Sequence, residues 1–151
     1  MAEKKGRRAK NVQITRDEIE RALKNYHWMI NSISIMEKRM DDIHVSTNKF
    51  GVEASLPKPQ GTTSDPVYGE VKRRSRYWKK IEEYKKKTAL IQELSDCITD
   101  EREYEVLTWI LNGKGYRWIA RHIGLSETHI RRIKDSIVEQ MYKTAQMSQT
   151  A

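Results

Sequence analysis

The chain has 151 residues, enough for one domain or two small ones. Its 29 Lys and Arg outnumber 21 Asp and Glu, giving a net charge of +8, and only 37% of its residues are apolar. This composition favours long, partly exposed helices over a compact α/β fold. The basic excess indicates a polyanionic partner, and no apolar run reaches the roughly 18 residues that a membrane span needs. Nucleic acid is therefore a better candidate partner than a membrane.

Cysteine and histidine usage excludes several other classes. Cys97 is the only cysteine, so no intrachain disulfide can form, and no apolar segment of a signal peptide follows the basic N-terminus. We therefore expect a cytoplasmic protein. The histidines lack cysteine or carboxylate partners at ligand spacing, and Asp41 and Asp42 beside His44 are more typical of a solvated helix end. We expect no metal, no cofactor and no membrane partner.

The N-terminal part begins with a basic tail, residues 1–14, which contains five Lys or Arg and is expected to be disordered. A second role of this tail on phosphates stays open. Thr15 and Glu18 then have the spacing of a capping box. Apolar residues recur at helical spacing from Ile19 to Ile43, which predicts a helix of about 28 residues.

Residues 44–65 are rich in Pro, Gly, Ser and Thr and are predicted to form a loop. Asp65 and Pro66 then suit the start of a second long helix, which we expect to continue to about Ile98. Apolar positions that include Val67, Val71 and Trp78 follow one predicted stripe. The stretch 15–98 is thus expected to be an antiparallel, coiled-coil-like hairpin, although pairing between two copies of the chain, as a homodimer, is equally permitted.

The second predicted helix also carries nine Lys or Arg between residues 72 and 87. Such a run is usually a solvated face, but its density, with aromatic residues interleaved, also suits nucleic-acid phosphates. Both interpretations stay open. The residues of this secondary basic patch are Lys72, Arg73, Arg74, Arg76, Lys79 and Lys80.

Residues 99–143 are predicted to form a helix-turn-helix domain, followed by a frayed tail at 144–151. Thr99 is expected to cap a helix that ends at Gly113. In the stretch YRWIARHIGLSETHIRRI, Ala120 allows close helix crossing and Gly124 permits a positive φ in the turn. Ser126 is a good N-cap for the next helix.

The outward residues of that last helix can meet base edges and phosphates in a major groove. They are Glu127, Thr128, His129, Arg131, Arg132 and Lys134. The alternative is a helical hairpin that merely packs, but the Arg and Lys cluster is not needed for packing. Residues 99–151 nevertheless contain eight Lys or Arg against seven Asp or Glu, so the reading domain is only weakly basic.

The stretch ITDEREYEVLTWILNGKGYRWIARHIGLSETHIRRIKDSIVEQM resembles region 4 of bacterial sigma-70-type factors, which reads the −35 promoter element. The full chain is similar to the small phage-encoded late-gene regulators of the ArpU, RinA and LtrC type. They carry such a module after a helical N-terminal part. This resemblance implies an all-α fold and activation of late phage genes through host RNA polymerase.

The resemblance also divides the candidate site by role. By position, Glu127, Thr128 and Arg132 would face base edges, Arg131 and Lys134 would lie near phosphates, and Ser126 would cap the helix. Beyond the resemblance, we expect His129 to help read bases and Ser126, Arg117 and Lys114 to contact phosphates. The chain lacks the region 2 pattern with which sigma factors melt the −10 element. An accessory activator is therefore expected, not a factor that opens promoters alone.

Two alternatives belong to other functional classes. A small terminase subunit also combines a helix-turn-helix with long helices, although there the reader usually precedes the oligomerisation helices. An enzyme such as a recombinase would need clustered catalytic groups in a folded domain, whereas residues 1–98 offer two helices and a loop. We do not expect an enzyme.

Overall fold

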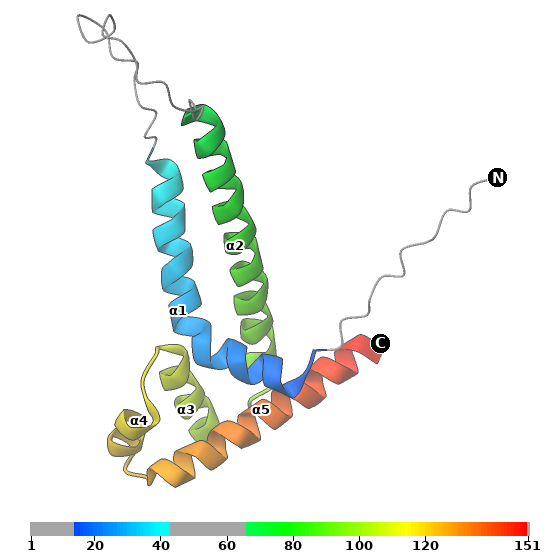
Figure 1. Cartoon of the computed structure of the whole chain (residues 1–151). Helices are drawn as coiled ribbons and strands as arrows, with labels where there is room; N and C mark the ends of the chain where they lie inside the picture. Colours follow the sequence, from blue (N-terminus) through cyan, green and yellow to red (C-terminus); the bar gives the residue numbers. More distant parts are fainter. Residues whose placement is uncertain (1–13, 43–65, 151) are drawn as a thin grey trace, which may run out of the picture. The chain divides into compact units, whose positions relative to one another are not determined.

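The computed structural model describes residues 14–42 and 66–150, and all regular elements in these two stretches are α-helices (Figure 1). The predicted all-α fold is confirmed. The basic tail before residue 14, the loop at 44–65 and the Asp65 cap lie outside the described residues. The helices are α1 (Arg16–Asp41), α2 (Pro66–Ser95), α3 (Glu101–Leu111), α4 (Tyr116–Ile123) and α5 (Glu127–Thr150).

The chain divides into two compact units, and α1 and α2 each contribute to both. We call residues 14–27 and 89–150 the terminal unit, and residues 28–42 and 66–88 the middle unit. The sequence suggested a boundary at residue 98, between hairpin and helix-turn-helix. The boundary differs because Ile19, Leu23 and Ile91, on the two long helices, are fully buried in the terminal unit.

The terminal unit has a well-packed core. The ten largest fully buried side chains of the described residues all belong to it, and α3 and α4 pack against α5 and against each other. Each such side chain contributes roughly 1.5–3 kcal/mol when removed from water. These residues are Ile19, Leu23, Ile91, Val106, Leu107, Ile119, Ile130, Ile137, Val138 and Met141.

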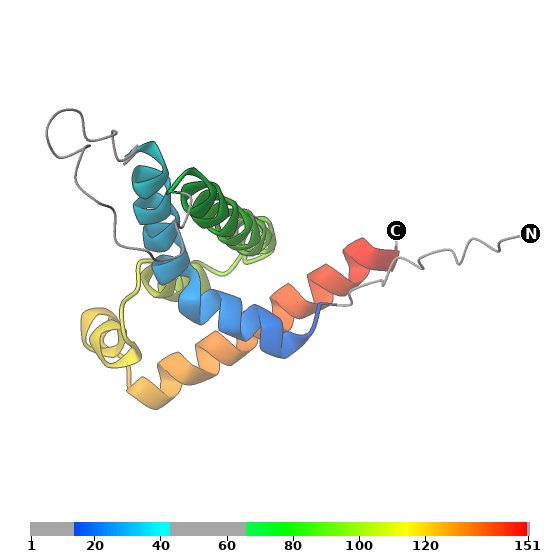
Figure 2. The same ribbon diagram turned by 45° about the horizontal axis from the view of Figure 1, so that its top comes forward.

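The first part of α1 lies antiparallel to α5 within this unit, as Figures 1 and 2 both show. Glu20 accepts a hydrogen bond from Lys134, and Arg16 lies 3.9 Å from Glu139. Helix α5 extends to Thr150 and so includes most of the segment 144–151 that was predicted to fray. Ala145 is buried there, and this packing holds a segment whose sequence alone favours fraying.

The middle unit is an antiparallel pair of helical segments. The ring of Trp28 meets the edge of Tyr84 at 5.4 Å between centroids, and Lys85 pairs with Glu37 at 2.7 Å. Its buried side chains are few. They are Met29, Ile33, Ile81 and Thr88.

The predicted apolar stripe of α2 is wrong in its first half. Val67, Val71 and Trp78 are 62%, 59% and 63% exposed, whereas Ile81 and Thr88 are buried. At about 100° per residue, the first three positions lie on average roughly 70° around the helix from the other two. Apolar residues spaced by three, four or seven positions therefore do not all lie on the face of α2 that packs.

The helix starts were predicted well but not perfectly. The capping box is confirmed, since Thr15 N donates to Glu18 Oε2 at 2.9 Å and Glu18 N donates to Thr15 Oγ1 at 3.3 Å. The cap of α3 is Asp100 and not Thr99, as Asp100 Oδ1 accepts from the backbone N–H groups of Arg102 and Glu103. Asp is the stronger N-cap of the two neighbours, so the helix begins one residue later.

Among the glycines of residues 14–42 and 66–150, two have positive φ, Gly113 at 76° and Gly124 at 78°. A Cβ on Gly113 would also lie 2.7 Å from a ring carbon of His27, whereas one on Gly124 would meet open space. We expect Gly124→Ala to lower the free energy of unfolding by about 1–2 kcal/mol, the cost of a left-handed residue. Gly113→Ala should lower it further, because the ring must also move.

Denaturant unfolding followed by circular dichroism measures both losses. Gly115→Ala serves as the reference, because Gly115 has an ordinary φ and nothing near its added Cβ. Equal losses for Gly113→Ala and Gly124→Ala would show that the packing against His27 contributes nothing.

Candidate nucleic-acid interface

The helix-turn-helix consists of α4, α5 and the turn Gly124–Ser126. Gly124, in the left-handed conformation, donates its N–H to Ala120 O at 3.0 Å, and Leu125 donates to the same oxygen at 2.9 Å. Ser126 Oγ accepts from His129 N at 3.2 Å. The predicted turn role of Gly124 and capping role of Ser126 are therefore confirmed.

A small core holds the two helices together. Ile119, Ala120 and Ile130 are buried, and the side chain of Ala120 is short enough for α4 and α5 to approach closely. The same packing fixes the rotation of α5 about its own axis. The opposite face of its first turns is thereby turned to solvent.

That outward face carries most of the predicted base-reading residues. Thr128, His129 and Arg132 are exposed, and Glu127 is half-buried. Arg132 lies at the centre of this face, about half a helical turn around from the buried Ile130 side. It forms no ion pair with any residue in the described stretches, so its guanidinium is available to a ligand.

Glu127 and Arg131, predicted to contact bases and phosphates respectively, pair with each other. Arg131 donates to Glu127 Oε1 at 2.6 Å, and its guanidinium lies 5.2 Å from the ring centre of Tyr116. The hydrogen bond and charge of Glu127 raise the pKa of Arg131. Both side chains are largely exposed, so the pair adds little stability and a phosphate could displace the carboxylate.

Lys134 is the one predicted phosphate contact that the structure contradicts. It is only 8% exposed and pairs with Glu20 of α1 and with Asp135. Burial lowers the pKa of Lys134, but the two carboxylates outweigh it and the net shift is upward. The reason is its place in the helix. Lys134 comes four residues after Ile130 and three before Ile137, so it lies on the same side of α5 as these buried residues.

Lys114 and Arg117, the other predicted phosphate contacts, are exposed at the start of α4. Gly115 is the N-cap of this helix and supplies no side-chain acceptor. The backbone N–H groups there point outward at the positive end of the helix dipole, which favours an anion. A role for both side chains on phosphates stays a prediction.

An aromatic cluster that was not predicted from the sequence joins α3 to α4. Trp118 stacks on His122 at 4.8 Å, and Trp109 of α3 meets the edge of Trp118 at 5.0 Å. Lys114 Nζ lies 5.0 Å from the ring centre of Trp118. The i, i+4 spacing of Trp118 and His122 was the available signal. The cluster fixes Lys114 beside the start of α4.

The secondary basic patch belongs to the middle unit, so the structure does not bring it into the helix-turn-helix. Part of it is already neutralised, because Arg73 and Arg74 pair with Glu70, and Lys80 pairs with Glu83. The described stretches contain no group of three His, Cys, Asp or Glu that could hold a metal. None of their helices is long and apolar enough to cross a bilayer.

Comparison with known proteins gives one informative similarity. The uncharacterized protein YqaQ of Bacillus subtilis (strain 168) is 24% identical over 134 residues, which cover 85% of this chain and 89% of that protein. The part of this chain outside the match is smaller than either compact unit, so the similarity extends into both units. No family model and no solved structure matches the chain.

A substitution at Lys134 separates a structural role from a DNA contact. Lys134→Gln should lower the free energy of unfolding by about 1–2 kcal/mol, because a mostly buried charge-assisted pair is lost. The salt dependence of DNA binding should stay unchanged. Denaturant unfolding and fluorescence anisotropy with a labelled duplex measure the two quantities.

Lys143→Gln is the matched control, because Lys143 lies on the same helix but is exposed and 3.8 Å from Glu139. We expect it to change stability by less than about 0.5 kcal/mol. The Lys134 pair is complete below the usual lysine pKa of about 10.4 and is lost only as pH rises through the raised value, so neutral pH leaves it intact. Loss of DNA affinity without loss of stability in Lys134→Gln would contradict the buried role.

Proposed function

We propose that the chain is a sequence-specific DNA-binding transcription activator that acts with bacterial RNA polymerase in the manner of sigma region 4. The observation that carries this proposal is the exposed face at the start of α5, the second helix of a well-packed helix-turn-helix. This face presents Thr128, His129 and Arg132, and Arg132 forms no ion pair with a described residue. The link to polymerase, to phage late genes and to a bacterial host's cytoplasm comes from the sequence resemblance.

In this proposal the N-terminal half of α5 enters the major groove. Arg132 would donate two hydrogen bonds to a guanine, which is the commonest specific contact in such grooves. Glu127 can accept from a cytosine amino group once Arg131 turns to a phosphate. Lys114 and Arg117 would position the start of α4 on the backbone. These contacts set register and orientation, and the base contacts set specificity.

The weak charge of the reader supports an accessory role. Residues 99–151 have a net charge of only +1, and one of their cations, Lys134, is held in the core by Glu20. Few phosphate contacts remain, and phosphate contacts supply much of the affinity for DNA. A reader of this kind benefits from a second protein on the same DNA, as an activator does from polymerase.

Arg132→Ala and Arg131→Ala should have different effects. The first should cost about 1–3 kcal/mol of binding free energy and relax preference at one base position. The second should weaken binding evenly across sequences. Binding selections with randomised duplexes measure both, and Lys143→Ala is the control on the same helix. Unchanged preference in Arg132→Ala would remove α5 from the role of reader.

The most direct test selects fragments of the source genome with the purified chain and maps the bound sites. The proposal predicts sites just upstream of promoters, from which the chain stimulates transcription by the host polymerase.

One observation favours the alternative of a small terminase subunit. Seven of the ten exposed large apolar side chains among the described residues belong to the middle unit, which suits self-association. Sites beside packaging genes, bound by a large ring without effect on polymerase, would favour that alternative.

A further inference from the structure

The nine Lys and Arg between residues 72 and 87 fall into two groups once their contacts are known. Six lie within ion-pair distance of a carboxylate. Arg73 and Arg74 pair with Glu70, Lys80 and Lys87 with Glu83, Lys86 with Glu82, and Lys85 with Glu37. The remaining three, Lys72, Arg76 and Lys79, form no ion pair with any residue of the described stretches.

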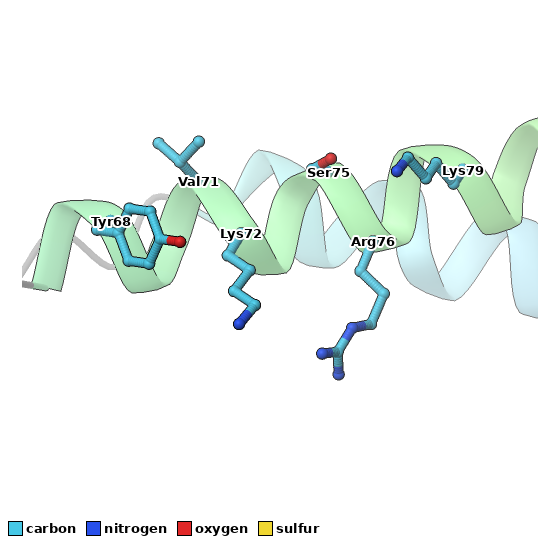
Figure 3. A pocket seen from close by; sticks show the side chains of 6 residues that line it. All are labelled: Tyr68, Val71, Lys72, Ser75, Arg76 and Lys79. Carbon is cyan, nitrogen blue, oxygen red and sulfur yellow. The ribbon is translucent and has the colours of Figure 1, made fainter. Parts of the chain in front are cut away.

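These three cations share one face of α2. They stand at positions i, i+4 and i+7, so they span about 10.5 Å along the helix. All three are exposed and line a shallow hollow together with Tyr68, Val71 and Ser75, as Figure 3 shows. We call Lys72, Arg76 and Lys79 the unpaired basic face. None of the described residues that line this hollow is acidic, so none of them competes with an incoming anion.

The paired cations are less available to a ligand. Glu70 accepts hydrogen bonds from Arg73 and Arg74, and these bonds lower its pKa to about 2. The carboxylate is charged at neutral pH, so an anion that binds these arginines must compete with it. The hydrogen bonds of Lys87 and Lys80 likewise lower the pKa of Glu83. An anion on those cations must displace a carboxylate, whereas an anion on the unpaired basic face displaces only solvent ions.

We propose that the unpaired basic face is a second DNA-contact surface, which holds phosphates of a duplex without reading its sequence. This inference rests on duplex DNA as the partner under the proposed function. The length of the face corresponds to about three phosphates of one strand, at 3.4 Å per nucleotide along the axis. Residues 66–88 carry nine Lys or Arg and three Glu, so α2 supplies the positive charge that the weakly basic reader lacks.

The test compares two triple variants of the full chain. Lys72→Gln, Arg76→Gln and Lys79→Gln remove the unpaired basic face. Arg74→Gln, Lys86→Gln and Lys87→Gln remove three paired cations from the same helix and serve as the matched control. Circular dichroism checks that both variants keep the helical content of the parent chain. Fluorescence anisotropy with a long labelled duplex then gives the affinity over a range of salt concentrations.

Neutralising three phosphate contacts should lower the slope of log affinity against log salt by up to about 2.7. We expect most of this change in the variant of the unpaired basic face and little in the matched control. Base preference should remain that of the parent chain. Equal slopes in all three proteins, or equal changes in the two variants, would overturn the inference. The inference would also be overturned if binding to phosphatidylserine vesicles needed the unpaired basic face and binding to the duplex did not.

Arg132→Ala, measured in the same assay, keeps this inference separate from the proposed function. If Arg132→Ala alters base preference and the unpaired-face variant leaves the slope intact, the reader stands and the second surface fails. If the unpaired-face variant lowers the slope and Arg132→Ala leaves preference intact, the second surface stands and the reader fails. A parent chain that binds no duplex would overturn both.

Discussion

The direction of every outward side chain on α5 depends on the burial of its inner face. Ile130, Ile137 and Met141 are completely removed from water, and this core belongs to the same unit as α3, α4 and the start of α1. A rotation of α5 about its axis would expose these side chains, at a cost of roughly 1.5–3 kcal/mol for each. The burial of this inner face thus fixes which residues of α5 face solvent, and it thereby sets the positions of the candidate base-reading residues.

Much of this arrangement could be predicted from local signals. The capping box at Thr15, the left-handed Gly124 and the Ser126 cap each depend on a few neighbouring residues, and each is found as expected. The failed prediction for Lys134 involved a distant partner. Its spacing from Ile130 places it on the core side of α5, but no local pattern shows that Glu20, more than a hundred residues away in the chain, pairs with it there. The contact of Gly113 with His27 has the same origin.

The distribution of charge gives the two units different candidate tasks. The terminal unit offers a shaped face with one unpaired arginine at its centre, which suits discrimination between sequences. The middle unit offers a row of cations on a thinly packed pair of helices, which suits attraction without discrimination. Affinity and specificity would then come from separate surfaces, and substitutions in one would leave the other intact.

The ion pair between Glu20 and Lys134 has a consequence for how the protein is made. The core of the terminal unit joins α1, which leaves the ribosome early, to α5, which leaves it late. Until α5 emerges, this core lacks the buried side chains that α5 supplies, among them Ile130, Ile137 and Met141, and it stays incomplete. Long sequence separation of this kind slows folding and prolongs exposure to aggregation. The terminal unit therefore completes its fold only after α5 has been synthesised.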